Sequence, residues 1–304
     1  MTTDRPAVGF IGLGDMGGRI AKRIAHAGFV LTVFDKRIEA CRELAADGAL
    51  VAVDVAQLAD SSDVICICVV DDVQLQAVVN QMRNTLRPNQ ILVIHSSVMP
   101  DTVREIGTEL ATFDVGVVDA PVSGSRPAAD AGTLTVMVGG DPTTIDAVAP
   151  LLTAYASNLI RVGVLGSGQA LKIANNVMLH MNHLIALEAV RFARSQGIAE
   201  SALIETANIS SGRSWVTETW GLIDSMTTDH PLSGTDAIYP LMSKELWHSL
   251  TLSRETMTTM PLTALGAAVS EMYFRERERD LEQLNEHNKI DTSSWSRYYI
   301  ATDD

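Results

Sequence analysis

Lys172 and Asn176 are the two residues of this chain whose types and spacing best suit acid–base chemistry on a hydroxyl group. They are four residues apart in a segment with helical periodicity, so we expect both on one face of a helix. An amine and an amide can then address the same hydroxyl. A free lysine has a pKa of about 10.4, so Lys172 can act as a base only if desolvation or a nearby cation lowers its pKa. Lys244 is the candidate for that cation.

A glycine-rich segment follows an apolar strand pattern and begins a helix pattern: Gly12-Leu13-Gly14-Asp15-Met16-Gly17. The first glycine permits a tight turn, the second lets the backbone approach a pyrophosphate, and the third allows close packing of the helix on the strand. The helix N-terminus offers free N–H groups to the phosphates. Asp35 ends the next strand pattern, 18 residues beyond Gly17. Together these features predict a dinucleotide-binding site.

Asp35 also bears on which dinucleotide is bound. Its carboxylate would accept hydrogen bonds from the adenosine ribose and would repel the extra phosphate of NADP, which favours NAD. Lys36 and Arg37 follow directly and could hold that phosphate, so NADP stays as the less favoured alternative.

Ser123 and Gly124 follow a strand pattern that ends at Asp119. Open α/β sheets bind ligands at the carboxyl ends of their strands. A hydroxyl group and a backbone N–H at that place suit a substrate carboxylate. A β-turn without a ligand is the competing interpretation.

The elements that must position these residues change type at Gly163. Before it, strand and helix patterns alternate, and the strands are apolar without clean alternation, as in a parallel sheet covered on both faces by helices. The expected strands are 7–11, 30–34, 49–52, 64–70, 91–95, 115–119, 134–138 and 159–162. The expected helices are 16–27, 38–46, 73–86, 101–111 and 142–156. This half predicts a doubly wound α/β domain of the Rossmann type.

Helical patterns alone follow Gly163, at residues 169–196, 201–209, 244–260 and 262–287. The first of these would reach roughly 40 Å, long enough to leave one domain and run through the next. We therefore expect a Rossmann domain over residues 1–165 and an all-helical domain over residues 166–304, entered by the long helix. The charged run 275–280 predicts a solvated helix face. The segment from Thr292 onward has no periodicity and is expected to form a tail.

Composition narrows the class of protein. The 304 residues carry a net charge of −14, which disfavours binding to a phosphate backbone, so we expect no nucleic-acid partner. The longest strictly apolar run, 64–70, is far shorter than the roughly 20 residues that span a bilayer. No signal-peptide pattern opens the chain, and cysteines are few, so we expect a cytoplasmic protein. Cys66 and Cys68 alternate on one strand pattern and are expected to pack in the core rather than bind metal.

Four ordered motifs resemble those of the 3-hydroxyisobutyrate dehydrogenase, or β-hydroxyacid dehydrogenase, family. They are Gly9–Gly17, Asp119–Gly124 with Gly132–Leu134, Gly166–Asn176, and Leu241–Leu246. The resemblance implies that Lys172 is the general acid/base and that Asn176 orients the substrate hydroxyl. It also implies that Ser123 and Gly124 hold the substrate carboxylate and that Lys244 closes the site over cofactor and substrate.

Motif and resemblance together assign further binding residues. Those expected to bind the cofactor are Phe10, Ile11, Gly12, Leu13, Gly14, Asp15, Met16, Gly17, Asp35, Lys36, Val69, Val70, Gln74, Ser97 and Lys244. Those expected to bind the substrate are Ser123, Gly124, Ser125, Trp215, Trp220 and Lys244. Two tryptophans at this spacing are also common in a protein core. Without the resemblance, four of the cofactor residues would be interpreted as ordinary loop residues: Val69, Val70, Gln74 and Ser97.

The chain departs from the family pattern at several positions. Ser97 stands for Thr, Ser125 for a second Gly, Trp220 for Tyr, Glu245 for Asp, and Asp236-Ala237 for Gly-Phe. These changes leave the catalytic residues and alter the expected pocket wall. We therefore expect a substrate related to 3-hydroxyisobutyrate rather than necessarily that compound.

The favoured hypothesis is NAD-dependent oxidation of a small 3-hydroxy acid to its semialdehyde or oxo acid by hydride transfer. An NADPH-dependent semialdehyde or imine reductase of the same fold is disfavoured because such relatives usually lack the lysine and the acid at the positions of Lys172 and Asp35. A noncatalytic nucleotide-binding protein is disfavoured because such relatives lose the lysine and carry basic extensions.

A helical domain with exposed apolar faces predicts a homodimer or homotetramer.

Overall fold

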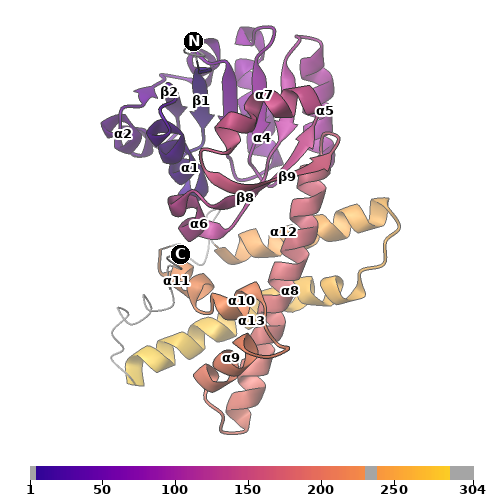
Figure 1. Cartoon of the computed structure of the whole chain (residues 1–304). Coiled ribbons are helices and arrows are strands. Elements are labelled where there is room, and N and C mark those ends of the chain that lie inside the picture. Colours follow the sequence, from indigo (N-terminus) through magenta and orange to yellow (C-terminus); the bar gives the residue numbers. More distant parts are fainter. Residues whose placement is uncertain (1–4, 230–237, 288–304) are drawn as a thin grey trace. The chain divides into compact units, whose positions relative to one another are not determined.

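The computed structural model describes residues 5–229 and 238–287, which belong to two compact units, Met1–Lys172 and Ile173–Asp304 (Figure 1). The division falls within one long helix, so the expected domain boundary at residue 165 stays a prediction. The expected tail from Thr292 onward and the Asp236-Ala237 departure lie outside the described residues.

The first unit is built on one nine-stranded sheet with the order β3-β2-β1-β4-β5-β6-β8-β7, in which β9 also pairs with β8. The first six strands are parallel, and the strand order reverses between β1 and β4, the position at which such sheets bind ligands. The strands are β1 Val8–Ile11, β2 Leu31–Phe34, β3 Leu50–Val51, β4 Val64–Ile67, β5 Ile91–Ile94, β6 Gly116–Asp119, β7 Val122–Ser123, β8 Leu134–Gly140 and β9 Ala156–Gly163.

The expectation of a parallel sheet is wrong at β8, which runs antiparallel to both β6 and β7. A strand buried on both faces is apolar whichever way its neighbours run, so its composition does not show its direction. The two-residue strand β7 is also absent from the expected elements, because it is too short to have a period.

Helices pack on both faces of this sheet and form two apolar clusters with it. One cluster takes side chains from α1 Asp15–His26, α2 Ile38–Ala46, α6 Ser125–Ala131 and α7 Pro142–Leu152. The other takes them from α3 Val55–Asp60, α4 Asp72–Met82 and α5 Pro100–Ala111. A 3-10 turn, Arg83–Thr85, extends α4. The short helices α3 and α6 are absent from the expected elements, and the others begin and end within a few residues of expectation.

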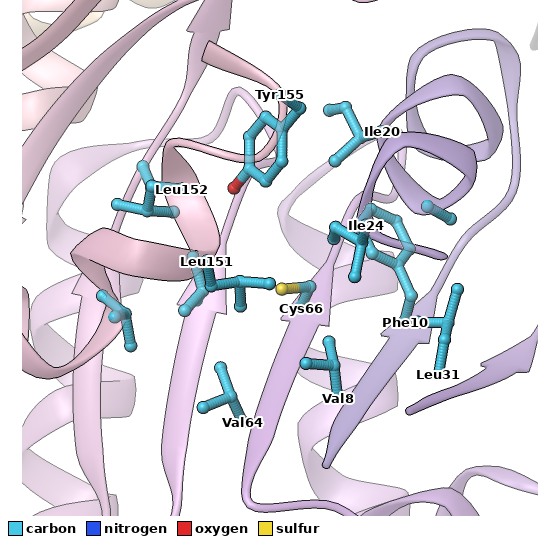
Figure 2. Packing of buried hydrophobic residues seen from close by; sticks show 14 of the residues in the cluster. Val8, Phe10, Ile20, Ile24, Leu31, Val64, Cys66, Leu151, Leu152 and Tyr155 are labelled. Carbon is cyan, nitrogen blue, oxygen red and sulfur yellow. The ribbon is translucent and has the colours of Figure 1, made fainter. Parts of the chain in front are cut away.

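Buried polar contacts tie the strands together beneath the glycine-rich segment. Figure 2 shows Phe10, Cys66 and Tyr155 among aliphatic side chains of the first cluster. His95 bonds through Nδ1 to the Ala120 carbonyl at 2.8 Å and through Nε2 to the Tyr155 hydroxyl at 3.1 Å. Burial lowers the pKa of His95 to about 4, although the Ala120 bond opposes this. His95 is therefore a neutral core residue at physiological pH.

The cysteines pack as core residues, with one correction. Cys66 lies in β4 and is fully buried, whereas Cys68 lies just beyond the end of that strand, so the two do not alternate along it. Burial raises the pKa of the Cys66 thiol, and that of Cys68 to about 12. Both sulfurs are therefore protonated and poorly reactive at neutral pH.

The second unit is helical in the described residues. Helix α8, Ser167–Ser195, is 29 residues long and leads into it. The others are α9 Glu200–Asn208, α10 Trp215–Glu218, α11 Leu222–Asp229, α12 Ile238–Glu255 and α13 Pro261–His287. Their core contains Leu184, Leu187, Met242, Leu246, Ala267 and Phe274. Helices α10 and α11 are absent from the expected elements; α10 is a four-residue turn held by a reciprocal cap between Ser214 and Thr217.

Arg277 overturns the expectation that residues 275–280 form a solvated face. Its side chain is buried, pairs with Glu200 and Asp224 at 2.8 and 2.7 Å, and lies over the Trp220 ring. Burial alone lowers the pKa of an arginine, but these two carboxylates outweigh it and raise the pKa of Arg277 further above its already high value. A charge buried in this way is stable only because it is paired on both sides.

In the part of the chain that the structure describes, no helix combines the length and apolar character that crossing a bilayer requires. The cytoplasmic location expected from the sequence stays a prediction.

Candidate functional site

The glycine-rich turn between β1 and α1 has the shape that a pyrophosphate requires. Gly12 has a φ of +90°, and a Cβ on it would collide with the carbonyl oxygen of Cys68. A Cβ on Gly17 would collide with the Gly12 carbonyl oxygen, so only glycine lets α1 approach the turn. Gly14 faces open space and caps α1 without a side-chain bond, which leaves the first N–H groups of the helix available to an anion.

Asp35, just after β2, holds this turn in place. Its Oδ2 accepts the Leu13 N–H at 2.6 Å, and its Oδ1 accepts the Arg37 N–H at 2.8 Å. The Arg37 guanidinium lies beside the same carboxylate and donates to the Leu13 carbonyl at 3.2 Å. Lys36 is exposed. The predicted ribose-binding acid is therefore also a structural clamp, and of the two neighbouring cations it is Arg37 that lies against the turn.

The loops after β4 and β5 are joined to each other. The Val69 N–H donates to Ser96 Oγ at 2.7 Å, and Gln74 accepts the Val70 N–H at 3.4 Å. The amide of Gln169 donates to the Ser96 carbonyl at 2.8 Å and accepts the Val98 N–H at 3.2 Å. These bonds bring Val69, Val70, Gln74 and Ser97, all predicted cofactor residues, into one connected set of loops.

Asp119, at the end of β6, caps the N-terminus of α8. Its two carboxylate oxygens accept the N–H groups of Gly166 and Gln169, each at 2.7 Å. The side chain is fully buried, and burial raises its pKa although the bonds from Gly166 and Gln169 oppose this. Gly168 and Gly139 leave room for it, because a Cβ at either would crowd Asp119. A carboxylate in the sheet therefore sets the start of the helix that carries Lys172.

Lys172 and Asn176 lie one turn apart on α8, and both side chains are buried, with exposures of 9% and 2%. Asn176 donates from Nδ2 to Glu245 Oε2 at 2.6 Å, and its Oδ1 accepts from Asn175 at 3.2 Å. His180, one further turn along, contacts the same Glu245 oxygen at 2.7 Å. The predicted hydroxyl-orienting amide is thus fixed by its neighbours.

The predicted carboxylate-binding segment forms a sharp turn between β7 and α6. Gly124 has a φ of +130° and Ser125 a φ of +62°. The family pattern has a second glycine at the position of Ser125, where such a positive φ favours glycine. A Cβ on Gly124 would collide with Ala128. Arg126, which follows, pairs with Asp15 of α1, and so links this turn to the glycine-rich turn.

The remaining predicted residues have different surroundings. Phe10, Ile11 and Leu13 are buried in and after β1, and Met16 is half-buried on α1. Lys244 is half-buried on α12 of the second unit. Trp215 is 40% exposed at the start of α10. Trp220 donates from its indole nitrogen to Glu200 at 2.6 Å beneath Arg277, contacts that give it a structural role without any substrate.

Four residues support predicted site residues or the elements that carry them but are absent from the predicted site residues: Asp119 and Gln169 in the first unit, and Glu245 and His180 in the second. Asp119 and Gln169 lie inside motifs that resemble those of the family, and Glu245 stands where the family pattern has Asp. Nothing local distinguishes a carboxylate that caps a distant helix from one that binds substrate. His180 carries no sequence signal of its own.

Two known protein families match successive parts of the chain. Residues 7–164 match the family described as the NAD-binding domain of 6-phosphogluconate dehydrogenase. Residues 166–286 match the family described as NAD-binding of NADP-dependent 3-hydroxyisobutyrate dehydrogenase.

Individual relatives agree as well. The chain is 31% identical over 266 residues to the mitochondrial 3-hydroxyisobutyrate dehydrogenase of Drosophila melanogaster, covering 86% of this chain and 82% of the relative. It is 31% identical over 273 residues to the human enzyme of the same name, covering 88% and 80%. A Mycobacterium tuberculosis 3-hydroxyisobutyrate dehydrogenase solved with L-serine superposes with a TM-score of 0.77 at 25% identity, covering 89% and 93%. The chain therefore belongs to the 3-hydroxyisobutyrate dehydrogenase family and is an NAD(P)-dependent oxidoreductase acting on CH–OH groups.

Proposed function

We propose that this protein oxidises a small 3-hydroxy acid related to 3-hydroxyisobutyrate, with NAD as the hydride acceptor. The observation that carries the proposal is the burial of Lys172 and Asn176 on one face of α8, a helix whose first turn is anchored by Asp119. A buried amine and amide one turn apart can act on one hydroxyl group, and a fixed helix holds both at constant separation.

The residues around the glycine-rich turn fit a dinucleotide. The open side of Gly14 and the uncapped start of α1 suit a pyrophosphate, and Asp35 has lone pairs left for a ribose hydroxyl. Val69, Val70, Gln74 and Ser97 would border the nicotinamide half. When bound, the cofactor supplies the acceptor for the hydride.

The chain's own residues would handle the proton and the orientation of the substrate. The Lys172 amine takes the hydroxyl proton as the C–H bond breaks, which requires its neutral form at that moment. Asn176 donates a hydrogen bond to the same oxygen. Ser123 Oγ and the Gly124 N–H donate to the substrate carboxylate, with Ser125 completing the turn. Lys244 and Trp215 are proposed to close the site, and the pocket role of Trp220 also stays a proposal.

NAD is proposed over NADP because Asp35 presents a carboxylate where the 2′-phosphate of NADP would lie. Arg37 is the opposing influence, since its guanidinium lies beside Asp35 and could turn toward a phosphate.

The test is a panel of small 3-hydroxy acids assayed at alkaline pH with NAD and with NADP, using the unchanged protein and Lys172→Ala. We expect turnover of a 3-hydroxyisobutyrate-like acid, and a fall of roughly 100-fold or more in kcat for Lys172→Ala with nearly unchanged cofactor affinity. Near-normal kcat in that variant would remove Lys172 from the role of acid/base.

Lys22→Ala is the matched control. Lys22 is an exposed lysine on α1 that pairs with Asp47 at 3.2 Å. Its loss removes the same charge from the chain, and we expect kcat and KM to stay at their original values. A comparable fall in both variants would point to a general charge effect.

A further inference from the structure

Glu245, on α12, joins two side chains of α8 within the second unit. One carboxylate oxygen, Oε2, accepts a hydrogen bond from Asn176 Nδ2 at 2.6 Å and lies 2.7 Å from His180 Nε2. The side chains of Asn176 and His180 are buried, and Glu245 is half-buried. Three polar side chains from two helices therefore meet at one oxygen atom in a largely desolvated place.

The amide of Asn176 has a limited number of hydrogen bonds to offer. An asparagine side chain has two N–H donors and one carbonyl oxygen. Among the described residues, Glu245 takes one N–H and Asn175 occupies one lone pair of the oxygen. The second N–H is left to meet the hydroxyl oxygen of a substrate. The position of Glu245 thus sets the direction in which that remaining N–H points.

His180 is the second donor to Glu245. A carboxylate only accepts, so the imidazole must carry its proton on Nε2 to bond there. Its other nitrogen, Nδ1, is buried and has no hydrogen-bond partner among the residues that the structure describes. Leaving Nδ1 buried and unpaired costs free energy of folding, and the hydrogen bond from Nε2 to Glu245 offsets that cost.

We propose that His180 is a positioning residue that acts through Glu245 to hold the hydroxyl-binding amide of Asn176; the inference rests on the proposed role of Asn176 in substrate oxidation. Two donors on one oxygen, from residues one turn apart on α8, restrict rotation of the Glu245 carboxylate. Without His180, Oε2 loses one of the two donors that meet at it, and the carboxylate can then shift and carry the Asn176 amide with it. A small misorientation of a group that bonds the reacting oxygen lowers the rate of the chemical step.

The test compares His180→Leu with His180→Gln. His180→Leu removes the donor, and we expect kcat to fall on the order of tenfold while KM for the cofactor stays unchanged. His180→Gln restores an N–H that can reach Glu245 and should recover most of kcat. A general structural defect would not be rescued in this way. Normal kcat in His180→Leu, or no recovery in His180→Gln, overturns the inference.

Two further variants isolate the route through Asn176. If His180 acts through Asn176, then His180→Leu combined with Asn176→Ala should be no slower than Asn176→Ala alone, whereas independent effects would multiply. Glu245→Leu tests the same link by removing the acceptor oxygen that Asn176 and His180 share, and an unchanged kcat there overturns the inference.

The control is His183→Leu. His183 is an equally buried imidazole one turn along α8, packed against Phe274 and Trp220 rather than Glu245. We expect it to lower stability while kcat stays within about twofold of its original value. Activity of the unchanged protein is measured first. No activity on the hydroxy-acid panel would overturn the proposed function and this inference together, whereas an active protein with normal kcat in His180→Leu overturns the inference alone.

Discussion

Asp35 accepts the Leu13 and Arg37 N–H groups, so its carboxylate shapes the glycine-rich turn, and we propose that it also binds the adenosine ribose. In Asp35→Ala the glycine-rich turn loses the hydrogen bonds that Asp35 accepts from Leu13 and Arg37, and the repulsion between this carboxylate and the 2′-phosphate of NADP disappears. We expect KM for NAD to rise about tenfold, the equivalent of one charged hydrogen bond, with a smaller change for NADP. Steady-state kinetics with both cofactors measures the ratio.

Arg37→Ala is the companion variant. Without its guanidinium the protein should use NADP still less well, while KM for NAD changes little. An unchanged protein that already prefers NADP would show that Arg37 outweighs Asp35, and the proposed cofactor would then be wrong.

The N-terminus of α8 is the element that places Lys172 and Asn176, and Asp119 is its cap. Asp119→Ala leaves the Gly166 and Gln169 N–H groups unpaired in a buried place. We expect a loss of about 2 to 3 kcal/mol in the free energy of unfolding, together with a fall in kcat as the helix start shifts. Urea denaturation and initial-rate kinetics report the two effects.

Asp141→Ala supplies the comparison, because Asp141 caps α7 in the same way through Thr143 and Thr144 but is exposed. It should lose less stability and keep its kcat. Equal loss of kcat in both variants would show that any weakened helix cap in this chain lowers activity. The Asp119 cap of α8 would then have no specific effect on catalysis.

At the scale of the whole molecule, each unit contains a histidine held neutral by burial. Burial lowers the pKa of His95 to about 4 and, with the nearby charges of His180 and Arg277, that of His183 to about 3. The unfolded chain binds these protons as pH falls through 6.5, and the folded chain does not. Stability is therefore full above that pH and is lost below it, by roughly 2 kcal/mol per histidine between pH 7 and pH 5.

Urea denaturation at pH 7 and pH 5 tests this expectation. Burial raises the pKa of Glu200, but the bonds from Arg277 outweigh burial and lower it, so this carboxylate stays ionised over that range. His95→Gln should reduce the difference between the two pH values. The same free energy of unfolding at pH 7 and pH 5 in the unchanged protein would contradict the assignment of neutral buried histidines.

Assembly is the second expectation at this scale. Met178, Ile185 and Phe192 follow one side of α8 at seven-residue spacing and are 60 to 69% exposed. An apolar stripe of this kind is usually covered by another copy of the chain, so we expect a homodimer or homotetramer. Light scattering coupled to size exclusion should show it, and Ile185→Glu should weaken it. Val73→Glu, at an exposed position of α4, is the control. A species of 32.7 kDa at micromolar concentration in the unchanged protein would refute the expectation.

The sequence by itself determined the features that depend on neighbours along the chain. The order of most strands and helices, the glycine-rich turn with Asp35, and the placement of Lys172 and Asn176 on one helix face follow from periodicity and from residues within about 30 positions of one another. The family resemblance rests on the same local motifs. Elements too short to show a period, such as β7, α6 and α10, have no such signal in the sequence.

Only the tertiary structure decided the contacts between residues far apart in the chain. Asp119 caps a helix that begins almost fifty residues later, Glu245 reaches Asn176 and His180 from another helix, and Arg277 is buried by Glu200 and Asp224. The antiparallel direction of β8 is likewise decided only by the tertiary structure. Charge and polarity look alike in a sequence whether a side chain is solvated or paired, because the partner is chosen by the packing of whole elements.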